Sequence, residues 1–305
     1  MAESPAIATP SAKKPPSEGH KTGAARFDLA TLAGIALALA GILGGLLLER
    51  GSIQDIAQAT AAMIVFGGTF GAVLVTTPLP VVRRALKGLK AVFLTGDEAI
   101  ARRIDSLIEF AAKARRFGIV SLETEADGLP DPFLRKAMGL AVDGTDLAEL
   151  RKIMEIDIAL TEQAGEAEAR VWEAAGGYAP TVGIIGAVMG LIQVMKHLED
   201  IKAVGHGIAV AFVATVYGVG SANILFLPVA NKLRARHRAA TLLNEATLEG
   251  VLGIVEGLNP TLLRTKLSSF SPPQAEPAKR RRGKAPSRAP RNPAAAAARA
   301  GVGPS

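Results

Sequence analysis

Four stretches of the chain are apolar and long enough to cross a bilayer, and polar residues separate them. Each holds about 20 residues, the length that a helix needs to span hydrocarbon. They run approximately over residues Leu29 to Leu48, Ile56 to Pro78, Ala174 to Met195 and Gly207 to Val229. The connections 49–55 and 196–206 are short, so each pair of spans is predicted to form a helical hairpin.

The polar segment between the second and third spans, about residues 79–173, shows helical periodicity. After a cap at Thr95 or Asp97, one face of a helix collects Ile100, Ile104, Leu107, Ile108 and Ala111. A break is expected over 127–132, which holds Gly128, Pro130 and Pro132. No strand alternation of any length is seen, and no internal repeat.

Two further helices are predicted to join the polar segment to the spans. One begins near Asp146, repeats Leu147, Leu150, Ile153, Ile156 and Leu160 at helical spacing, and continues toward the third span. The other extends the fourth span through Leu242, Leu243 and Ala246, and Gly257 and Pro260 mark its end. The fold class predicted is an all-α membrane protein with four transmembrane helices and a helical domain between the second and the third.

Clusters of Lys and Arg set the predicted orientation. They precede the first span and follow the second and the fourth, and they contain Lys13, Lys14, Lys21, Arg26, Arg83, Arg84, Lys87, Lys90, Lys232, Arg234, Arg236 and Arg238. Because such clusters stay on the cytoplasmic side, four spans place both termini and the polar segment in the cytoplasm. An odd number of spans would put one cluster outside.

The composition adds to this picture at the two ends of the chain. Hydrophobic residues make up 49% and aromatic residues 4%, there is no Cys, and the net charge is +7. Residues 1–26 and 271–305 are rich in Pro, Ala and basic residues and are predicted to be disordered. The basic tail is interpreted as a solvated arm near an anionic leaflet in preference to a nucleic-acid-binding segment.

The same patterns divide the chain into six parts. They are a disordered N-terminus (1–26), a first transmembrane hairpin (27–80), a helical domain (81–173), a second hairpin (174–230), a helix that leaves the membrane (231–270) and the basic tail (271–305).

The spans carry no carboxylate at their centres. The third and fourth contain only neutral polar groups: Thr181, Gln193, Thr215, Tyr217, Ser221 and Asn223. A proton relay through a bilayer needs an ionisable side chain at depth. If this protein conducts ions, a second polypeptide must supply the carboxylate. The many Gly and Ala residues of both spans allow close helix contact, and that packing without conduction is the alternative.

Three residues of these spans have two interpretations. Pro180 and Pro228 lie near the ends of the third and fourth spans, where proline either makes a hinge or marks a helix boundary, as expected of Pro78 and Pro80. The hydroxyl of Thr215 either helps to bind an ion or water, or bonds its own backbone.

Several motifs together resemble those of a known family. Ala211-Phe-Val-Ala-Thr215-Val-Tyr-Gly218, with Pro228 thirteen residues after the Thr, resembles the fourth-span signature of MotA-type flagellar motor stator subunits, and 180–190 resembles their third span. Ala114-Arg115-Arg116-Phe-Gly118-Ile-Val-Ser-Leu-Glu123 and Ile254-Val-Glu-Gly257-Leu-Asn259-Pro260 also match family motifs. Gly220 departs from the pattern, since a bulky apolar residue is usual there.

The resemblance implies a multi-pass subunit of the bacterial inner membrane that forms a homo-pentamer around a pair of MotB-like partners. Such a partner has one span with an aspartate and binds peptidoglycan. Ion flow through the complex moves the ring, which pushes charged residues on a FliG-like rotor switch protein. No cofactor and no metal is implied.

The resemblance also implies roles for individual residues. Pro180 and Pro228 would be the hinges, and Thr215, Thr181 and Ala187 would lie along the ion path. Arg115 and Glu123 would contact the rotor, with Lys113, Arg116 and Glu125 sharing that role. A solvated helix face is the alternative for these charges. Sodium-type relatives tend to have Thr where Ala187 stands, so the missing hydroxyl favours protons.

Three other functions are weighed against this one. A TolQ- or ExbB-like energiser of outer-membrane processes is the nearest, but those relatives usually have three spans. A passive membrane scaffold would need no partner carboxylate. An enzyme is disfavoured, because the sequence has no P-loop, GxSxG or HExxH motif and its His residues are scattered.

Overall fold

The computed structural model describes residues 26–92, 94–95 and 99–270, and helices form nearly all of these. The α-helices are α1 (Leu29–Leu48), α2 (Ile53–Ile56), α3 (Ala59–Thr76), α4 (Leu79–Val92), α5 (Ala99–Phe117), α6 (Glu123–Asp127), α7 (Pro132–Val142), α8 (Leu147–Lys196), α9 (Ile201–Ser221), α10 (Leu227–Val255) and α11 (Pro260–Ser268). A 3-10 turn, η1 (Ile119–Leu122), follows α5, and a π-helical turn, η2 (Ala222–Phe226), joins α9 to α10. The two ends predicted to be disordered and the candidate cap Asp97 lie outside the described residues.

One short strand pair corrects the expectation that the chain has no strands. β1 (Arg26–Phe27) pairs antiparallel with β2 (Leu94–Thr95), so Thr95 is not a helix cap. A strand of two residues is too short to show an alternating pattern, so this pair could not be predicted from periodicity.

The four predicted spans are present as helices long and apolar enough to cross a membrane. α1 has the predicted bounds, from Leu29 to Leu48. The second span begins later than expected, at Ala59, because residues 53–56 form the separate helix α2 and Gln58 has an extended backbone. The all-α membrane fold with four spans is confirmed.

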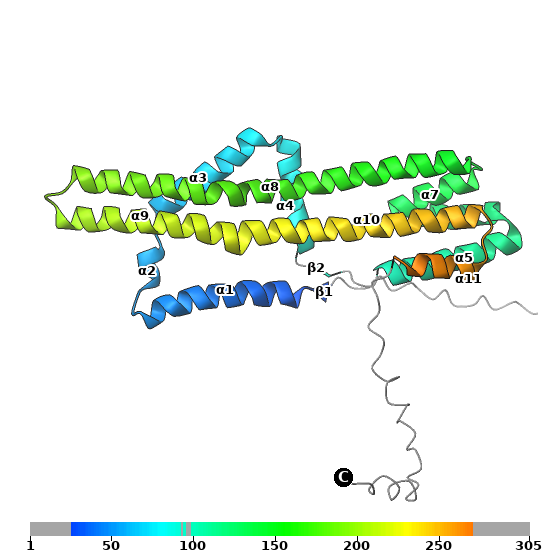
Figure 1. The fold of residues 1–305 in the computed structure, drawn as a ribbon, viewed down its shortest axis with the longest axis horizontal. Coiled ribbons are helices and arrows are strands. Elements are labelled where there is room, and N and C mark those ends of the chain that lie inside the picture. Colours follow the sequence, from blue (N-terminus) through cyan, green and yellow to red (C-terminus); the bar gives the residue numbers. More distant parts are fainter. Residues whose placement is uncertain (1–25, 93, 96–98, 271–305) are drawn as a thin grey trace, which may run out of the picture. The chain divides into compact units, whose positions relative to one another are not determined.

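The third and fourth spans belong to two long helical rods that lie side by side, α8 in green and α9–α10 in yellow (Figure 1). α8 runs for 50 residues from its N-cap Asp146, whose Oδ1 accepts the Ala148 N–H at 2.9 Å. The fourth span continues through η2 into α10. Gly257, with φ of 69°, turns the chain before Pro260 opens α11. The predicted continuity of both spans with polar helices is therefore correct.

A polar domain, defined here as α5 to α7 with the first turns of α8, the end of α10 and α11, has its own apolar core. Leu107, Met138, Leu150, Met154 and Leu252 are fully buried in it. The predicted face of α5 is confirmed.

The helix predicted from the repeat near Asp146 is confirmed as the start of α8, but two residues of the repeat, Ile156 and Leu160, are 52% and 59% exposed. The buried row of α8 is instead Leu150, Met154 and Ile158, because residues four apart stack on one side of a helix.

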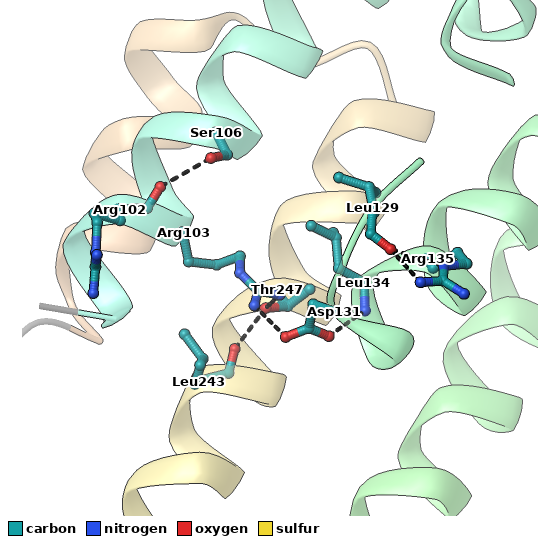
Figure 2. A network of polar contacts seen from close by, with 9 residues as sticks. All are labelled: Arg102, Arg103, Ser106, Leu129, Asp131, Leu134, Arg135, Leu243 and Thr247. Carbon is teal, nitrogen blue, oxygen red and sulfur yellow. Dashed lines mark hydrogen bonds and ion pairs between the residues drawn. The ribbon is translucent and has the colours of Figure 1, made fainter. Parts of the chain in front are cut away.

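A polar network ties three helices of this domain together (Figure 2). Arg103 of α5 forms an ion pair with Asp131, the N-cap of α7, and donates from Nη1 to Thr247 Oγ1 of α10 at 3.2 Å. The hydroxyl of Thr247 is buried and donates to the carbonyl of Leu243 at 2.7 Å. Asp131 also accepts the backbone N–H of Leu134 at 3.0 Å.

The ionisation of the Asp131 carboxyl is expected to make the stability of the polar domain depend on pH. Burial opposes its ionised form, but the Leu134 N–H and the Arg103 guanidinium outweigh burial, so the pKa of Asp131 lies below its ordinary value. The stabilisation is therefore complete above the unfolded pKa of about 3.9 and is lost as pH falls through the lower folded value. Asp131→Asn is expected to cost about 1 to 2 kcal/mol at neutral pH.

Thermal melting of the purified protein between acid and neutral pH tests this. The melting temperature of Asp131→Asn should lie a few degrees below wild type at neutral pH and approach it in acid. Asp105→Asn, at an exposed pair with Arg264, is the control and should follow wild type. Parallel curves for wild type and Asp131→Asn would contradict the assigned role.

Candidate functional site

The third and fourth spans contact each other backbone to backbone. A Cβ placed on Gly218 would lie 2.5 Å from the Ala179 carbonyl oxygen and 3.1 Å from the Gly183 Cα. A Cβ on Gly190 would lie 2.7 Å from the Gly207 carbonyl oxygen. Real Cβ atoms do not approach backbone this closely, so these positions require glycine. The small residues noted in the sequence thus hold α8 and α9 in contact at two levels.

Both threonines predicted for the ion path bond their own helices. The half-buried Thr215 donates from Oγ1 to the Ala211 carbonyl at 3.2 Å. Thr181 is exposed and donates to the Tyr178 carbonyl at 2.8 Å. This arrangement is the alternative that the sequence left open for Thr215. Ala187 is half-buried, one turn beyond Gly183.

The two predicted hinge prolines have different surroundings. Pro180 lies inside α8, which is helical on both sides of it, so the interpretation as a helix boundary is wrong there. Proline has no N–H, which leaves the Gly176 carbonyl without its usual helical partner. Pro228 stands in the first turn of α10, directly after η2. Pro78 does mark a boundary, between α3 and α4.

Ion pairs join α8 to α10 just beyond these prolines, on the side of the polar domain. Arg234 of α10 contacts Glu166 at 3.1 Å and Glu173 at 2.8 Å, both on α8. Lys232 pairs with Asp28, the N-cap of α1. The two rods are therefore connected by charge on one side of the prolines and by glycine packing on the other.

The five charges predicted to face a rotor are all exposed and lie close together in the polar domain. Lys113, Arg115 and Arg116 end α5, and Glu123 and Glu125 form the first turn of α6. Gly118, with φ of 84°, allows the turn between the two helices. Lys113 Nζ contacts Glu125 Oε1 at 2.7 Å. Within the part of the chain that the structure describes, Arg115, Arg116 and Glu123 have no ion pair.

Comparison with known proteins decides between the families that the sequence suggested. Residues 125–246 match the model of the MotA/TolQ/ExbB proton channel family, and residues 32–116 match the motility protein A N-terminal model. Motility protein A of Helicobacter pylori is 36% identical over 83% of this chain and 98% of its own. The counterpart from Bacillus subtilis is 33% identical over 81% and 92%. The chain belongs to the motility protein A family.

Solved structures agree with this assignment to the motility protein A family. The C. jejuni MotAB structure matches with a TM-score of 0.76 and 34% identity, covering 82% of this chain and 98% of its counterpart. The flagellar MotAB stator complex of Bacillus subtilis matches with a TM-score of 0.71 and 33% identity, covering 83% and 98%. The N-terminal model covers α1 from Leu32 onward and all of α3. These two helices form the first hairpin, which distinguishes the four-span family from the three-span TolQ and ExbB relatives.

Sequence reasoning missed two features of this motility protein A chain. The Tyr217 hydroxyl donates to the Ile56 carbonyl and accepts the Gln58 N–H at 3.3 Å, so it ties the fourth span to the connection between α2 and α3. Phe117 and Val120, 73% and 64% exposed, lie between Arg116 and Glu123 in the chain and add exposed apolar surface to the charged cluster. The signal available for the first feature was a tyrosine in a span with few aromatic residues. The signal for the second was the Phe117-Gly118 pair directly after two arginines.

Proposed function

We propose that this chain is the ion-conducting subunit of a flagellar stator in the bacterial inner membrane, and that it turns the rotor by coupling proton flow to movement of the polar domain. One observation carries the proposal: the third and fourth spans form a tight wall without a carboxylate, in a chain of the motility protein A family. Such a wall needs a partner to complete a proton path.

A MotB-like single-span subunit is the proposed partner. It would supply the membrane aspartate beside Thr215, Thr181 and Ala187, with Pro180 and Pro228 as the hinges. The two related structures of MotAB complexes support such a partner. The lack of a hydroxyl at Ala187 supports protons over sodium.

A homo-oligomeric ring, a pentamer by resemblance, is proposed for the assembled subunit. Its support is the apolar surface that the single chain leaves uncovered in the spans. No residue of α1 is buried, and Phe212 on α9 is 70% exposed. Other copies, the partner and lipid would cover these faces.

The rotor contact is proposed for the charged cluster at the α5–α6 turn. Its support is the exposure of Lys113, Arg115, Arg116, Glu123 and Glu125 on a domain outside the spans. Exposed charges steer a transient contact through complementarity without strong binding. Both termini and the polar domain would face the cytoplasm, where a FliG-like rotor protein can be reached.

Swimming by cells that carry Pro180→Ala tests the conformational role. Alanine restores the missing backbone hydrogen bond to Gly176 and stiffens α8. The variant is expected to assemble with its partner at wild-type levels and to swim at less than about a tenth of the wild-type speed. Partner co-purification and cell tracking measure the two properties.

Pro260→Ala is the matched control, because proline in the first turn of α11 replaces no helical hydrogen bond. It should swim normally. Normal swimming by Pro180→Ala as well would refute the hinge. Ion flux into vesicles that hold the assembled complex should follow a pH gradient and not a sodium gradient; the reverse would refute proton coupling.

A further inference from the structure

Helix α4 carries a cationic face that nothing in the described residues neutralises. Arg83, Arg84, Lys87 and Lys90 are all exposed, and none of them has an ion pair among residues 26–92, 94–95 and 99–270. One carboxylate, Glu168, lies against α4 at Gly88, but its Oε2 faces His237 Nε2 at 3.5 Å. Spacings of one, three and four residues put the four cations on one side of the helix.

The opposite face of α4 packs on the two rods on the polar-domain side of the prolines. Ala85 and Val92 are fully buried in a cluster with Trp172 of α8 and Leu233 of α10. The Trp172 indole N–H donates to the Ala85 carbonyl at 3.3 Å. The Trp172 ring also contacts Phe226, two residues before Pro228, with centroids 6.2 Å apart. α4 therefore contacts both rods, on the side of the proposed hinges that faces the polar domain.

The position of α4 in the chain places it at a membrane surface. α3, the second span, ends at Thr76, and α4 starts three residues later, at Leu79. Leu79 and Leu86, 49% and 54% exposed, lie between the cationic face and the buried face. A helix with cations on one side and exposed leucines beside them is typical of helices that lie in the headgroup region. Lysine and arginine next to a span attract anionic lipid.

We propose that the cationic face of α4 binds the headgroups of anionic phospholipids and so anchors α8 and α10 on the polar-domain side of Pro180 and Pro228. The inference rests on the proposed membrane function and adds a lipid class and a binding surface to it. Charge complementarity selects this occupant, because four cations without an ion pair among the described residues favour headgroups with a net negative charge over zwitterionic ones. Binding would then tie the stability of the hinge region to the lipid composition.

Thermal melting of the purified complex of this chain with its partner, in detergent micelles, tests the proposal. Phosphatidylglycerol is added to one sample and phosphatidylcholine to another. Phosphatidylglycerol should raise the melting temperature of wild type, and phosphatidylcholine should not. Each juxtamembrane cation contributes about fivefold to lipid affinity, so Arg83→Gln with Arg84→Gln should weaken the phosphatidylglycerol response roughly 25-fold in concentration.

Two control variants make the result specific. Arg115→Gln with Arg116→Gln removes the same charge from another adjacent pair, in the polar domain, and should respond like wild type. Arg83→Lys with Arg84→Lys keeps the charge and should also respond. An equal response from the Arg83/Arg84 glutamine variant, or equal stabilisation by inorganic phosphate, would overturn the proposal. Loss of oligomer in that variant would assign the face to a neighbouring copy and overturn it too. Because the readout uses neither swimming nor ion flux, failure here leaves the proposed function standing.

Discussion

Gly218→Ala is expected to abolish swimming, because it separates the third span from the fourth. The added Cβ would lie 2.5 Å from the Ala179 carbonyl oxygen, which belongs to a backbone that no rotamer change can move aside. Overpacking of this kind costs about 3 kcal/mol. The amount of folded complex in membranes should fall sharply, as measured by co-purification with the partner and by thermal melting, and cell tracking should show no swimming.

Gly220→Ala is the control for this change. It lies two residues away in the same helix, and a Cβ there would meet nothing within 4 Å. The variant should keep the complex and the swimming speed, even though the resemblance leads one to expect a bulky residue at this position. If Gly218→Ala and Gly220→Ala behave alike, the backbone contact between α8 and α9 has no importance for function.

Arg115→Glu combined with Arg116→Glu is expected to stop swimming while leaving the complex assembled. Both side chains are exposed and without an ion pair among the described residues, so their replacement breaks nothing inside the polar domain. Reversing their charge turns attraction to an oppositely charged rotor surface into repulsion. Swimming should fall at least about tenfold, whereas partner co-purification and the melting temperature should stay near wild type.

Lys152→Glu provides the comparison. Lys152 is exposed on α8 outside the cluster, and its reversal shifts the net charge in the same direction. This variant should swim. If Lys152→Glu cells do not swim, the loss of swimming depends on the total charge of the domain and not on the cluster. If the Arg115/Arg116 variant swims, the proposed rotor contact is wrong.

The sequence singled out candidate residues for the rotor contact but not the contacts that these residues make. Arg115 and Glu123 were recognised by their motif, and the structure places them on neighbouring helices across the turn at Gly118. Phe117 and Val120 were missed because an apolar residue in a helical pattern is normally assigned to the core. Ile156 and Leu160 belong to the repeat that correctly predicted the start of α8, yet both are exposed. Periodicity shows that a face is apolar, but not what covers it.

The spans, their number and their continuation into polar helices followed from the sequence, because hydrocarbon demands about 20 apolar residues with internally paired backbones. So did the absence of a carboxylate in the spans, from which a partner was inferred. Only the tertiary structure decided that Pro180 lies within a continuous helix and that Tyr217 holds the α2–α3 connection. It also decided which glycines carry the α8–α9 contact and that α4 packs on Trp172. These features depend on contacts between residues far apart in the chain. The pattern of apolar and polar residues in one segment shows which of its faces avoids water, but not which other segment covers that face.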